Sequence, residues 1–167
     1  MRKIILSVAV SLDGFIEGPN GEYDWCPPPS KKEMDEFVAG IDVVFMGRKS
    51  YEMAGSFILA DKVTYVFSNT LKSVKGKNVK LLGGDVIKEV HSIRNEQGKN
   101  IWLWGGASLT TLLMNEGLVD EMWLGIAPVV LGNGKPLFQH IRQRHYFDLV
   151  STAGSNGYVS AVLRKKE

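Results

Sequence analysis

Hydrophobic and polar residues alternate along this chain in blocks that predict strands and helices in turn. Six apolar runs rich in β-branched or aromatic side chains predict strands: residues 3–10, 42–46, 63–67, 79–82, 101–104 and 119–127. Near the end, residues 145–152 and 157–164 predict a hairpin whose turn lies around Gly154–Gly157. Polar residues with glycine and proline separate the blocks, and we interpret those as loops.

Between the strands, apolar residues recur at the three- to four-residue spacing of helices. Ser30 and Glu33 have the spacing of a capping box, which predicts a helix start at this point. Asp85 suits the N-cap position of a second helix. A third helical pattern follows Gly106, with apolar positions at Leu109, Leu112 and Leu113.

This alternation predicts an α/β protein with a mostly parallel central sheet, flanking helices and an antiparallel C-terminal hairpin. The chain of 167 residues is 44% hydrophobic and 23% charged, which is ordinary for a globular protein. It has no internal repeat or clear linker. We therefore predict one domain over residues 1–167.

The net charge and the cysteine content argue against several classes of function. A net charge of +2 provides no strong field for nucleic acid or anionic membranes, and no apolar run approaches the ~20 residues of a membrane span. Cys26 is the single cysteine, so an intrachain disulfide is impossible and a cytoplasmic location is expected. His91, His140 and His145 show no metal-ligand spacing, so no metal site is predicted.

The most informative stretch is the passage from a strand into a helix at Gly105-Gly106. Glycine allows a close approach of ligand to backbone, and the free N–H groups of a helix start favour negative charge. A diphosphate would fit there. Tight packing of strand against helix explains the two glycines equally well.

Three other loops also follow predicted strands: Asp13-Gly14, Gly47-Arg48-Lys49-Ser50 and Ser68-Asn69. Because ligands of open α/β sheets bind beyond the carboxyl ends of the strands, we expect all four loops to converge on one crevice. Their cations, neutral donors and bare backbone suit a diphosphate with an additional ribose phosphate. The simpler interpretations are a solvated helix start for Arg48-Lys49, a turn for Asp13-Gly14 and a helix cap for Glu33.

At this point a family resemblance emerges. Phe45–Glu52, with the letters FMGRKSYE, resembles a motif of dihydrofolate reductase, as do Ser68-Asn69 and the Trp104–Ser108 turn. Three other segments resemble the reductase domain of the bifunctional riboflavin-biosynthesis deaminase/reductase: Ser11–Ile16, Gly117–Glu121 and Ala127–Gly132. The matches extend from residue 3 to about residue 138.

The resemblance implies the dihydrofolate-reductase-like fold and NADPH as cofactor. It implies ten cofactor-binding residues: Gly47, Arg48, Lys49, Ser50, Ser68, Asn69, Gly105, Gly106, Ala107 and Ser108. Asp13 and Glu33 are the expected catalytic residues, and Trp25 is expected to contact substrate. In such sites the cofactor carries the hydride chemistry while the protein orients it.

The resulting prediction is a stand-alone NADPH-dependent reductase of a small heterocycle, similar to a pyrimidine or pterin, or of a small carbonyl compound. It resembles 5-amino-6-(5-phosphoribosylamino)uracil reductase, and a homodimer is expected by the same resemblance. The identity of the substrate is not predicted, for two reasons. Trp104 stands where the riboflavin reductases usually carry glutamate. Their arginine-containing motif for the substrate phosphate is also absent between Gly55 and Val63. The alternative is a non-enzymatic module that binds a nucleotide or similar ligand.

Overall fold

The computed structural model of the protein describes residues 1–26, 28–55, 58–155 and 157–166. The strands are β1 (Ile4–Ser11), β2 (Phe15–Glu17), β3 (Ile41–Gly47), β4 (Val63–Phe67), β5 (Val79–Leu82), β6 (Asn100–Gly105), β7 (Glu121–Ala127), β8 (Lys135–Pro136), β9 (Phe147–Ser155) and β10 (Tyr158–Lys165). The helices are α1 (Lys31–Ala39), α2 (Arg48–Ala54), α3 (Val86–Asn95) and α4 (Ala107–Asn115).

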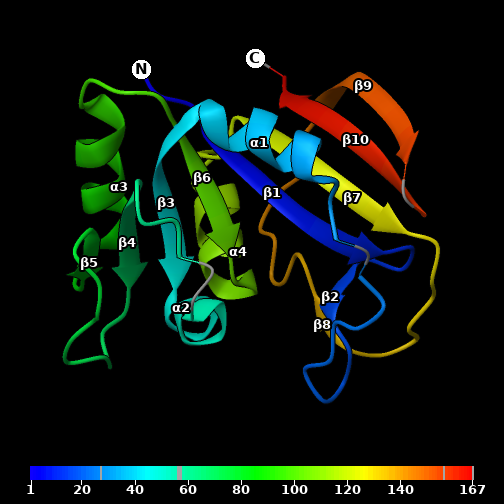
Figure 1. The fold of residues 1–167 in the computed structure, drawn as a ribbon, viewed down its shortest axis with the longest axis horizontal. Coiled ribbons are helices and arrows are strands. Elements are labelled where there is room, and N and C mark those ends of the chain that lie inside the picture. Colours follow the sequence, from blue (N-terminus) through cyan, green and yellow to red (C-terminus); the bar gives the residue numbers. More distant parts are fainter. Residues whose placement is uncertain (27, 56–57, 156, 167) are drawn as a thin grey trace.

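Eight of these strands form one sheet in the order β5-β4-β3-β6-β1-β7-β10-β9. The six strands from β5 to β7 pair in parallel, whereas β10 runs antiparallel to both β7 and β9. The predicted mostly parallel sheet with a C-terminal hairpin is therefore confirmed. Figure 1 shows the parallel strands with their carboxyl ends toward the bottom of the view.

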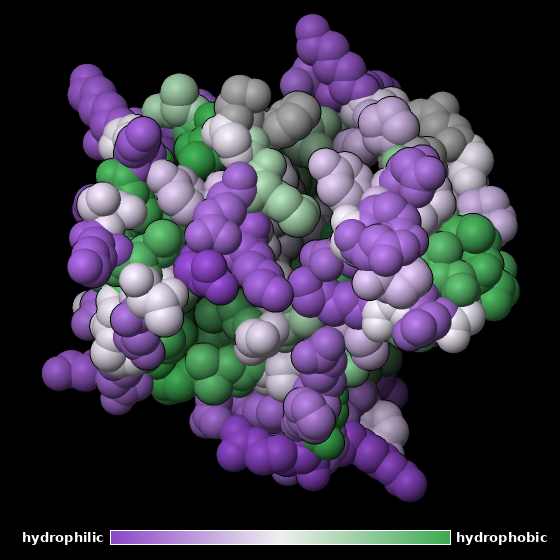
Figure 2. Space-filling model, turned by 90° about the horizontal axis from the view of Figure 1, so that it is seen from below, coloured by the Kyte–Doolittle hydropathy of each residue, from purple (hydrophilic) through white to green (hydrophobic). Residues whose placement is uncertain are grey.

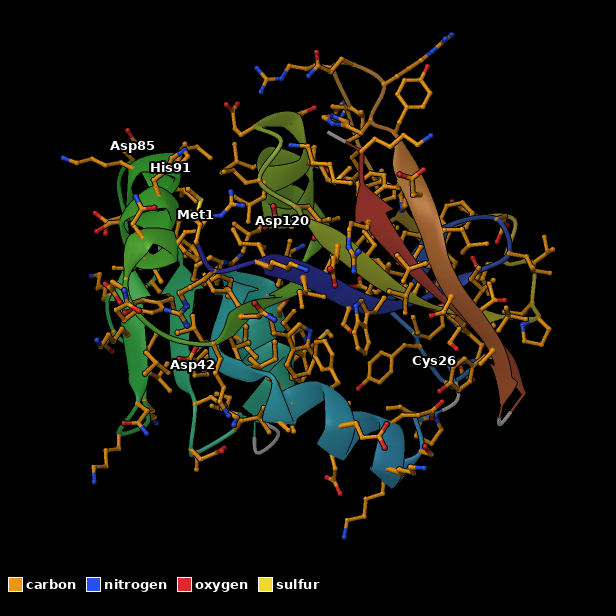
Figure 3. The ribbon with its side chains drawn as sticks, turned by 90° about the horizontal axis from the view of Figure 1, so that it is seen from above. Met1, Cys26, Asp42, Asp85, His91 and Asp120 are labelled. Atoms are coloured by element: carbon orange, nitrogen blue, oxygen red, sulfur yellow. The ribbon has the colours of Figure 1, made fainter. Side chains whose placement is uncertain are left out.

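Helices cover both faces of the sheet, and each face has its own core. On one face, Leu109 and Leu113 of α4 and Val90 of α3 pack with alternate residues of the strands, including Leu6 and Phe45. On the other face, Phe37 of α1 and Ala54 of α2 pack against Ile5, Val44 and Trp102. The two helical layers are visible in Figure 3, with α3 and α4 on one side of the sheet and α1 on the other.

The helix starts fall into two kinds. The predicted capping box at α1 is confirmed: the Ser30 hydroxyl accepts from the Glu33 N–H, and the Glu33 carboxylate accepts from the Ser30 N–H. The predicted cap of α3 is also confirmed, since the Asp85 carboxylate accepts from the N–H groups of residues 87 and 88. By contrast, α2 and α4 begin after Gly47 and Gly106, and neither has a side-chain cap hydrogen bond from the residues that the structure describes.

Some boundaries differ from the sequence prediction. The strand predicted from Val119 begins at Glu121, because Leu118 and Val119 are buried in the turn that precedes it. Strand β9 continues to Ser155, beyond the predicted end at residue 152. The small β2–β8 sheet was not predicted, since strands of three and two residues are too short to show a hydrophobic period. In the described part of the chain, no helix has both the length and the apolar character needed to cross a membrane.

Candidate functional site

The four loops singled out in the sequence follow β1, β3, β4 and β6, which are four consecutive strands of the sheet in the order β4-β3-β6-β1. All four strands are parallel, so their carboxyl ends meet at one edge. Figure 2 looks at the molecule from this edge and shows hydrophilic side chains gathered around its middle, beside a hydrophobic area. The four loops therefore share one edge of the sheet, and their convergence on one crevice stays a prediction.

At the centre of this edge, the glycines that end β3 and β6 form a close backbone junction. A Cβ on Gly47 would lie 3.7 Å from the carbonyl oxygen of Gly105 and 3.9 Å from the nitrogen of Gly106. A Cβ on Gly106 would lie 3.2 Å from the Ser50 Oγ. The peptide bond between Gly105 and Gly106 is cis, and Gly105 has a φ of 116°. We call Gly47, Ser50, Gly105 and Gly106 the glycine cradle.

The start of α4 opens onto the cradle with its backbone donors uncapped. Its first turn contains the buried Ala107 and the exposed Ser108, and it contains no acidic residue that would complement the helix dipole. Thr110 is fully buried, and its Oγ1 finds no hydrogen-bond partner among the described residues. This hydroxyl lies 3.7 Å from the position of a Cβ on Gly105. An anion with several oxygen acceptors would satisfy such a set of donors.

Two cations stand beside the cradle at the start of α2. Both Arg48 and Lys49 are exposed. Arg48 donates to Glu52 at 3.3 Å, and this pair is nearly half exposed on both sides. Exposed pairs at this spacing contribute only about 0.3–0.5 kcal/mol, so Arg48 can leave Glu52 for a phosphate at little cost.

The loop after β4 is built by its own polar side chains. The Ser68 Oγ accepts from the N–H groups of Thr70 and Leu71 at 3.1 and 3.0 Å, which closes a turn. The Asn69 Oδ1 accepts from the Gly84 N–H at 2.8 Å and so joins this loop to the one after β5. In this arrangement the two side chains shape the loop, and the Asn69 amide nitrogen stays available as a donor.

Asp13 connects the turn after β1 to the loop after β7. Its carboxylate accepts from the Ser11 hydroxyl at 2.6 Å and from the N–H groups of Leu131 and Gly132 at 3.2 and 2.7 Å. These hydrogen bonds, that from Ser11 above all, lower the pKa of Asp13. The side chain is therefore ionised at neutral pH and is engaged in loop structure.

Glu33 lies on α1 and has a partner that no local sequence pattern indicates. Besides its cap contacts with Ser30, its Oε2 accepts from the Tyr158 hydroxyl of β10 at 2.9 Å. The Ser30 hydrogen bonds and then that from Tyr158 lower the pKa of Glu33. Burial and the contact with Glu33 raise the pKa of Tyr158. A carboxylate that stays charged and a phenol that stays protonated thus meet between α1 and the C-terminal hairpin.

Trp25 lies in the loop before α1, where its indole N–H donates to the Glu22 carbonyl at 3.3 Å. The indole is only partly buried, so part of the ring is open to contact. The structure thus brings the cradle residues together in direct contact. Asp13, Trp25 and Glu33 belong to separate neighbouring segments, each with its own local contacts.

Sequence reasoning missed Tyr158 and Thr110. The Tyr158–Glu33 contact joins residues 125 positions apart, and such a pairing follows only from the sheet order. Thr110 lies four residues after Gly106, and in the sequence it cannot be distinguished from any other residue on the buried side of a helix. Its unsatisfied hydroxyl is visible only in three dimensions.

The model of the RibD C-terminal domain family matches residues 2–159. The chain belongs to this family. The uncharacterized protein YyaP of Bacillus subtilis (strain 168) is 41% identical over 177 aligned positions, which cover 96% of this chain and 94% of YyaP. The crystal structure of a putative riboflavin biosynthesis protein from Shewanella sp. PV-4 is similar with a TM-score of 0.87 and 25% identity, and 99% of each chain is covered.

A dihydrofolate reductase has the same fold at lower identity. The structure of the enzyme from Enterococcus faecalis, complexed with NADP(H), has a TM-score of 0.73 and 16% identity, with 99% of this chain and 97% of the other covered. The predicted dihydrofolate-reductase-like fold is therefore confirmed. The chain has a reductase-type fold of the RibD C-terminal family, and the backbone and hydroxyl donors of the glycine cradle are of the kind that a diphosphate accepts from.

Proposed function

We propose that this protein is an NADPH-dependent reductase of a small, flat heterocycle or of a small carbonyl compound. The observation that carries the proposal is the glycine cradle at the uncapped start of α4. Bare backbone, the Ser50 hydroxyl and the buried Thr110 hydroxyl meet there at the carboxyl edge of a parallel sheet. Ligands of open α/β sheets bind at this edge.

In this proposal the cradle and the first turn of α4, with Ala107 and Ser108, hold the diphosphate of the cofactor. Arg48 and Lys49 are placed to bind the additional phosphate on the adenosine ribose, and the Asn69 amide is placed to donate to it. Charge-assisted hydrogen bonds to phosphate are the strong ones, so these side chains supply the preference for NADPH over NADH. When bound, NADPH supplies a hydride to the substrate.

The substrate side is proposed to lie toward Asp13, Trp25 and Glu33. The lowered pKa of both carboxyl groups keeps them charged at neutral pH, so they act as acceptors that orient N–H groups of a heterocycle. Tyr158 remains protonated beside Glu33 and donates a hydrogen bond to that carboxylate from β10 at 2.9 Å. Trp25 offers a flat apolar surface on which a ring can stack.

The test is a turnover screen of the purified protein with NADPH. Pterins, aminopyrimidines and small carbonyl compounds are each added, and the loss of NADPH absorbance is followed. The proposal expects oxidation of NADPH that depends on one class of substrate and is slowed in Tyr158→Phe and Glu33→Gln. Tight NADPH binding without turnover of any compound would instead favour the non-enzymatic binding module. The homodimer expected from the resemblance stays a prediction, which sedimentation velocity can test.

A further inference from the structure

A hollow lies at the edge of the sheet opposite the glycine cradle, where β7 begins. Its volume is about 510 Å³, within the range of roughly 300–1,000 Å³ typical of small-molecule sites. Its walls are formed by five apolar side chains: Met114 of α4, Met122 of β7, Phe147 of β9, and Phe138 and Ile141 of the connecting loop. Phe138 and Ile141 are each 37% exposed, so an apolar surface faces an open space.

The loop wall of this hollow is held in place by α4. The N–H of Gln139 donates to the Thr111 Oγ1 at 3.1 Å, and the N–H of Arg142 donates to the Asn115 Oδ1 at 2.9 Å. The Asn115 amide in turn donates to the carbonyl oxygen of His140 at 3.2 Å. Three hydrogen bonds from one helix therefore fix the loop, and the hollow exists before any ligand arrives. A preformed site avoids the entropic cost of ordering a loop upon binding.

One end of the hollow is polar and positive. The Nε2 of His145 is buried and has no hydrogen-bond partner within the described ranges. Arg144 lines the hollow, and its guanidinium forms no ion pair or hydrogen bond with the residues that the structure describes. Arg144 and His145 also line a smaller adjoining hollow together with Lys165 and Lys166.

Both lysines already have partners. The Nζ of Lys166 lies 3.0 Å from the Asp148 carboxylate, and the Nζ of Lys165 donates to the Gly117 carbonyl at 2.8 Å. Among the cationic and imidazole groups of the two hollows, the Arg144 guanidinium and the His145 Nε2 therefore have no hydrogen-bond partner among the described residues. A buried polar atom without a partner is costly, which makes the His145 ring the second, independent indication of a ligand.

We propose that this hollow binds a small amphipathic anion, with its apolar body against the two methionines and Phe147 and its carboxylate at Arg144 and His145. Methionine side chains adapt to irregular apolar groups, so the body of the ligand can vary. The head group is more restricted, because the guanidinium fork matches the two oxygens of a carboxylate. This site is separate from the proposed reductase site and needs no cofactor.

The experiment is isothermal titration calorimetry of the whole protein with octanoate, compared with octanamide and acetate. Octanoate is expected to bind at one site. Octanamide lacks the charge and acetate lacks the apolar body, so each is expected to bind at least about 10-fold more weakly. No octanoate binding, or equal binding of octanoate and octanamide, would overturn the proposal.

Variants locate the site. Arg144→Ala is expected to weaken octanoate by about 10-fold or more. Ile141→Trp fills the hollow from its rim and is expected to abolish binding, with an unchanged circular dichroism spectrum showing that the fold is retained. Lys88→Ala is the matched control, since Lys88 is an exposed cation on α3, and it should bind octanoate like the wild type. Equal loss in Lys88→Ala and Arg144→Ala would contradict the assignment.

Sedimentation velocity separates this proposal from burial of the hollow by a second copy of the chain. If the hollow is a subunit contact, Ile141→Trp dissociates a dimer and octanoate gives no binding heat. That result would replace the ligand site with an interface. Binding of octanoate with an unchanged sedimentation coefficient supports the ligand site.

Discussion

Cations near the starts of β1 and β3 differ from those at the carboxyl edge in how they are paired. Near the amino ends of these strands, at the amino edge of the sheet, Arg2 is paired with Asp42, and Arg94 is paired with Asp120 at 2.6 Å. Figure 3 views the molecule from this edge, with both aspartates labelled. At the carboxyl edge, Arg48 has only an exposed partner and the start of α4 has no side-chain cap.

We infer that the paired charges stabilise the fold, whereas the weakly paired charges are available to a ligand. Arg2 is almost completely buried, and it donates to the Lys99 carbonyl at 2.6 Å as well as to Asp42. Such a network holds neighbouring segments together and leaves no donor for solvent or ligand. At the carboxyl edge, Arg48 has an exposed, weak partner in Glu52, and no side chain among the described residues caps the start of α4, so these donors stay available to a ligand. The comparison predicts that changes at the amino edge affect stability and changes at the carboxyl edge affect cofactor affinity.

The largest expected effect is a loss in the free energy of unfolding in the variant Arg2→Ala. Removing this cation leaves the Asp42 carboxylate without its partner, and breaking a buried ion pair costs about 3–5 kcal/mol. Because the Asp42 side chain is 39% exposed, water can replace part of the contact, so about 3 kcal/mol is expected in urea unfolding.

The control for Arg2→Ala is Lys32→Ala, which removes an exposed pair with Glu36 and should cost at most about 0.5 kcal/mol. The NADPH affinity of folded Arg2→Ala should equal that of the wild type. A large loss of affinity without a loss of stability would reverse the roles assigned to the two edges.

The next largest expected effect is a loss of cofactor affinity in the variant Gly106→Asp. Gly106 has a φ of −57°, which any residue adopts, so the fold should tolerate the change. The new carboxylate would cap α4 and repel a diphosphate, and NADPH binding should weaken by about 100-fold. Gly106→Ala separates charge from bulk, because its Cβ meets only the Ser50 hydroxyl at 3.2 Å. Wild-type affinity in Gly106→Asp would remove the start of α4 from the site.

A smaller effect compares the two kinds of helix start. Asp85→Ala removes the cap of α3 and should lower the free energy of unfolding by about 1 kcal/mol. Ser108→Ala in the first turn of α4 should change stability by less than about 0.5 kcal/mol, because Ser108 is exposed and makes no cap. Equal losses in the two variants, measured by chemical denaturation, would mean that α4 is capped in solution.

The smallest effect is a pH dependence at Glu33. Its pKa in the folded protein lies below its usual value of 4.5, so ionised Glu33 stabilises the fold above that pH. This contribution is lost as the pH falls through the folded-state pKa. The stability difference between wild type and Glu33→Gln should therefore be full at neutral pH and shrink below about pH 4.5. A constant difference across the acid range would argue against the Ser30 and Tyr158 contacts.

Most of the fold could be predicted from the sequence, because its signals are local. The capping box of Ser30 and Glu33, the Asp85 cap and the long apolar strands are complete within a few residues, and each is confirmed. The sheet order is not local. No strand order was predicted from the sequence, and the β2–β8 pair was not predicted because its strands are so short.

In the candidate site, too, the features with local sequence signals could be predicted and those that depend on distant segments could not. Gly47 and Gly105-Gly106 could be chosen because each follows a strand, and the structure places them against one another. The side chains of Ser68, Asn69 and Asp13 turned out to bind loop backbone, which no residue pattern indicates. The Tyr158 hydroxyl and the unsatisfied Thr110 hydroxyl depend on packing across distant segments, so only three-dimensional structure reveals them.

The central claim is that the carboxyl edge of the sheet holds NADPH and distinguishes it from NADH. Tryptophan fluorescence titration of the wild type and Arg48→Ala with both cofactors tests this claim directly. We predict saturable NADPH binding that is tighter than NADH binding, and a loss of ~1.5–3 kcal/mol for NADPH alone in Arg48→Ala. Binding of neither cofactor, or equal binding of both, would contradict the account.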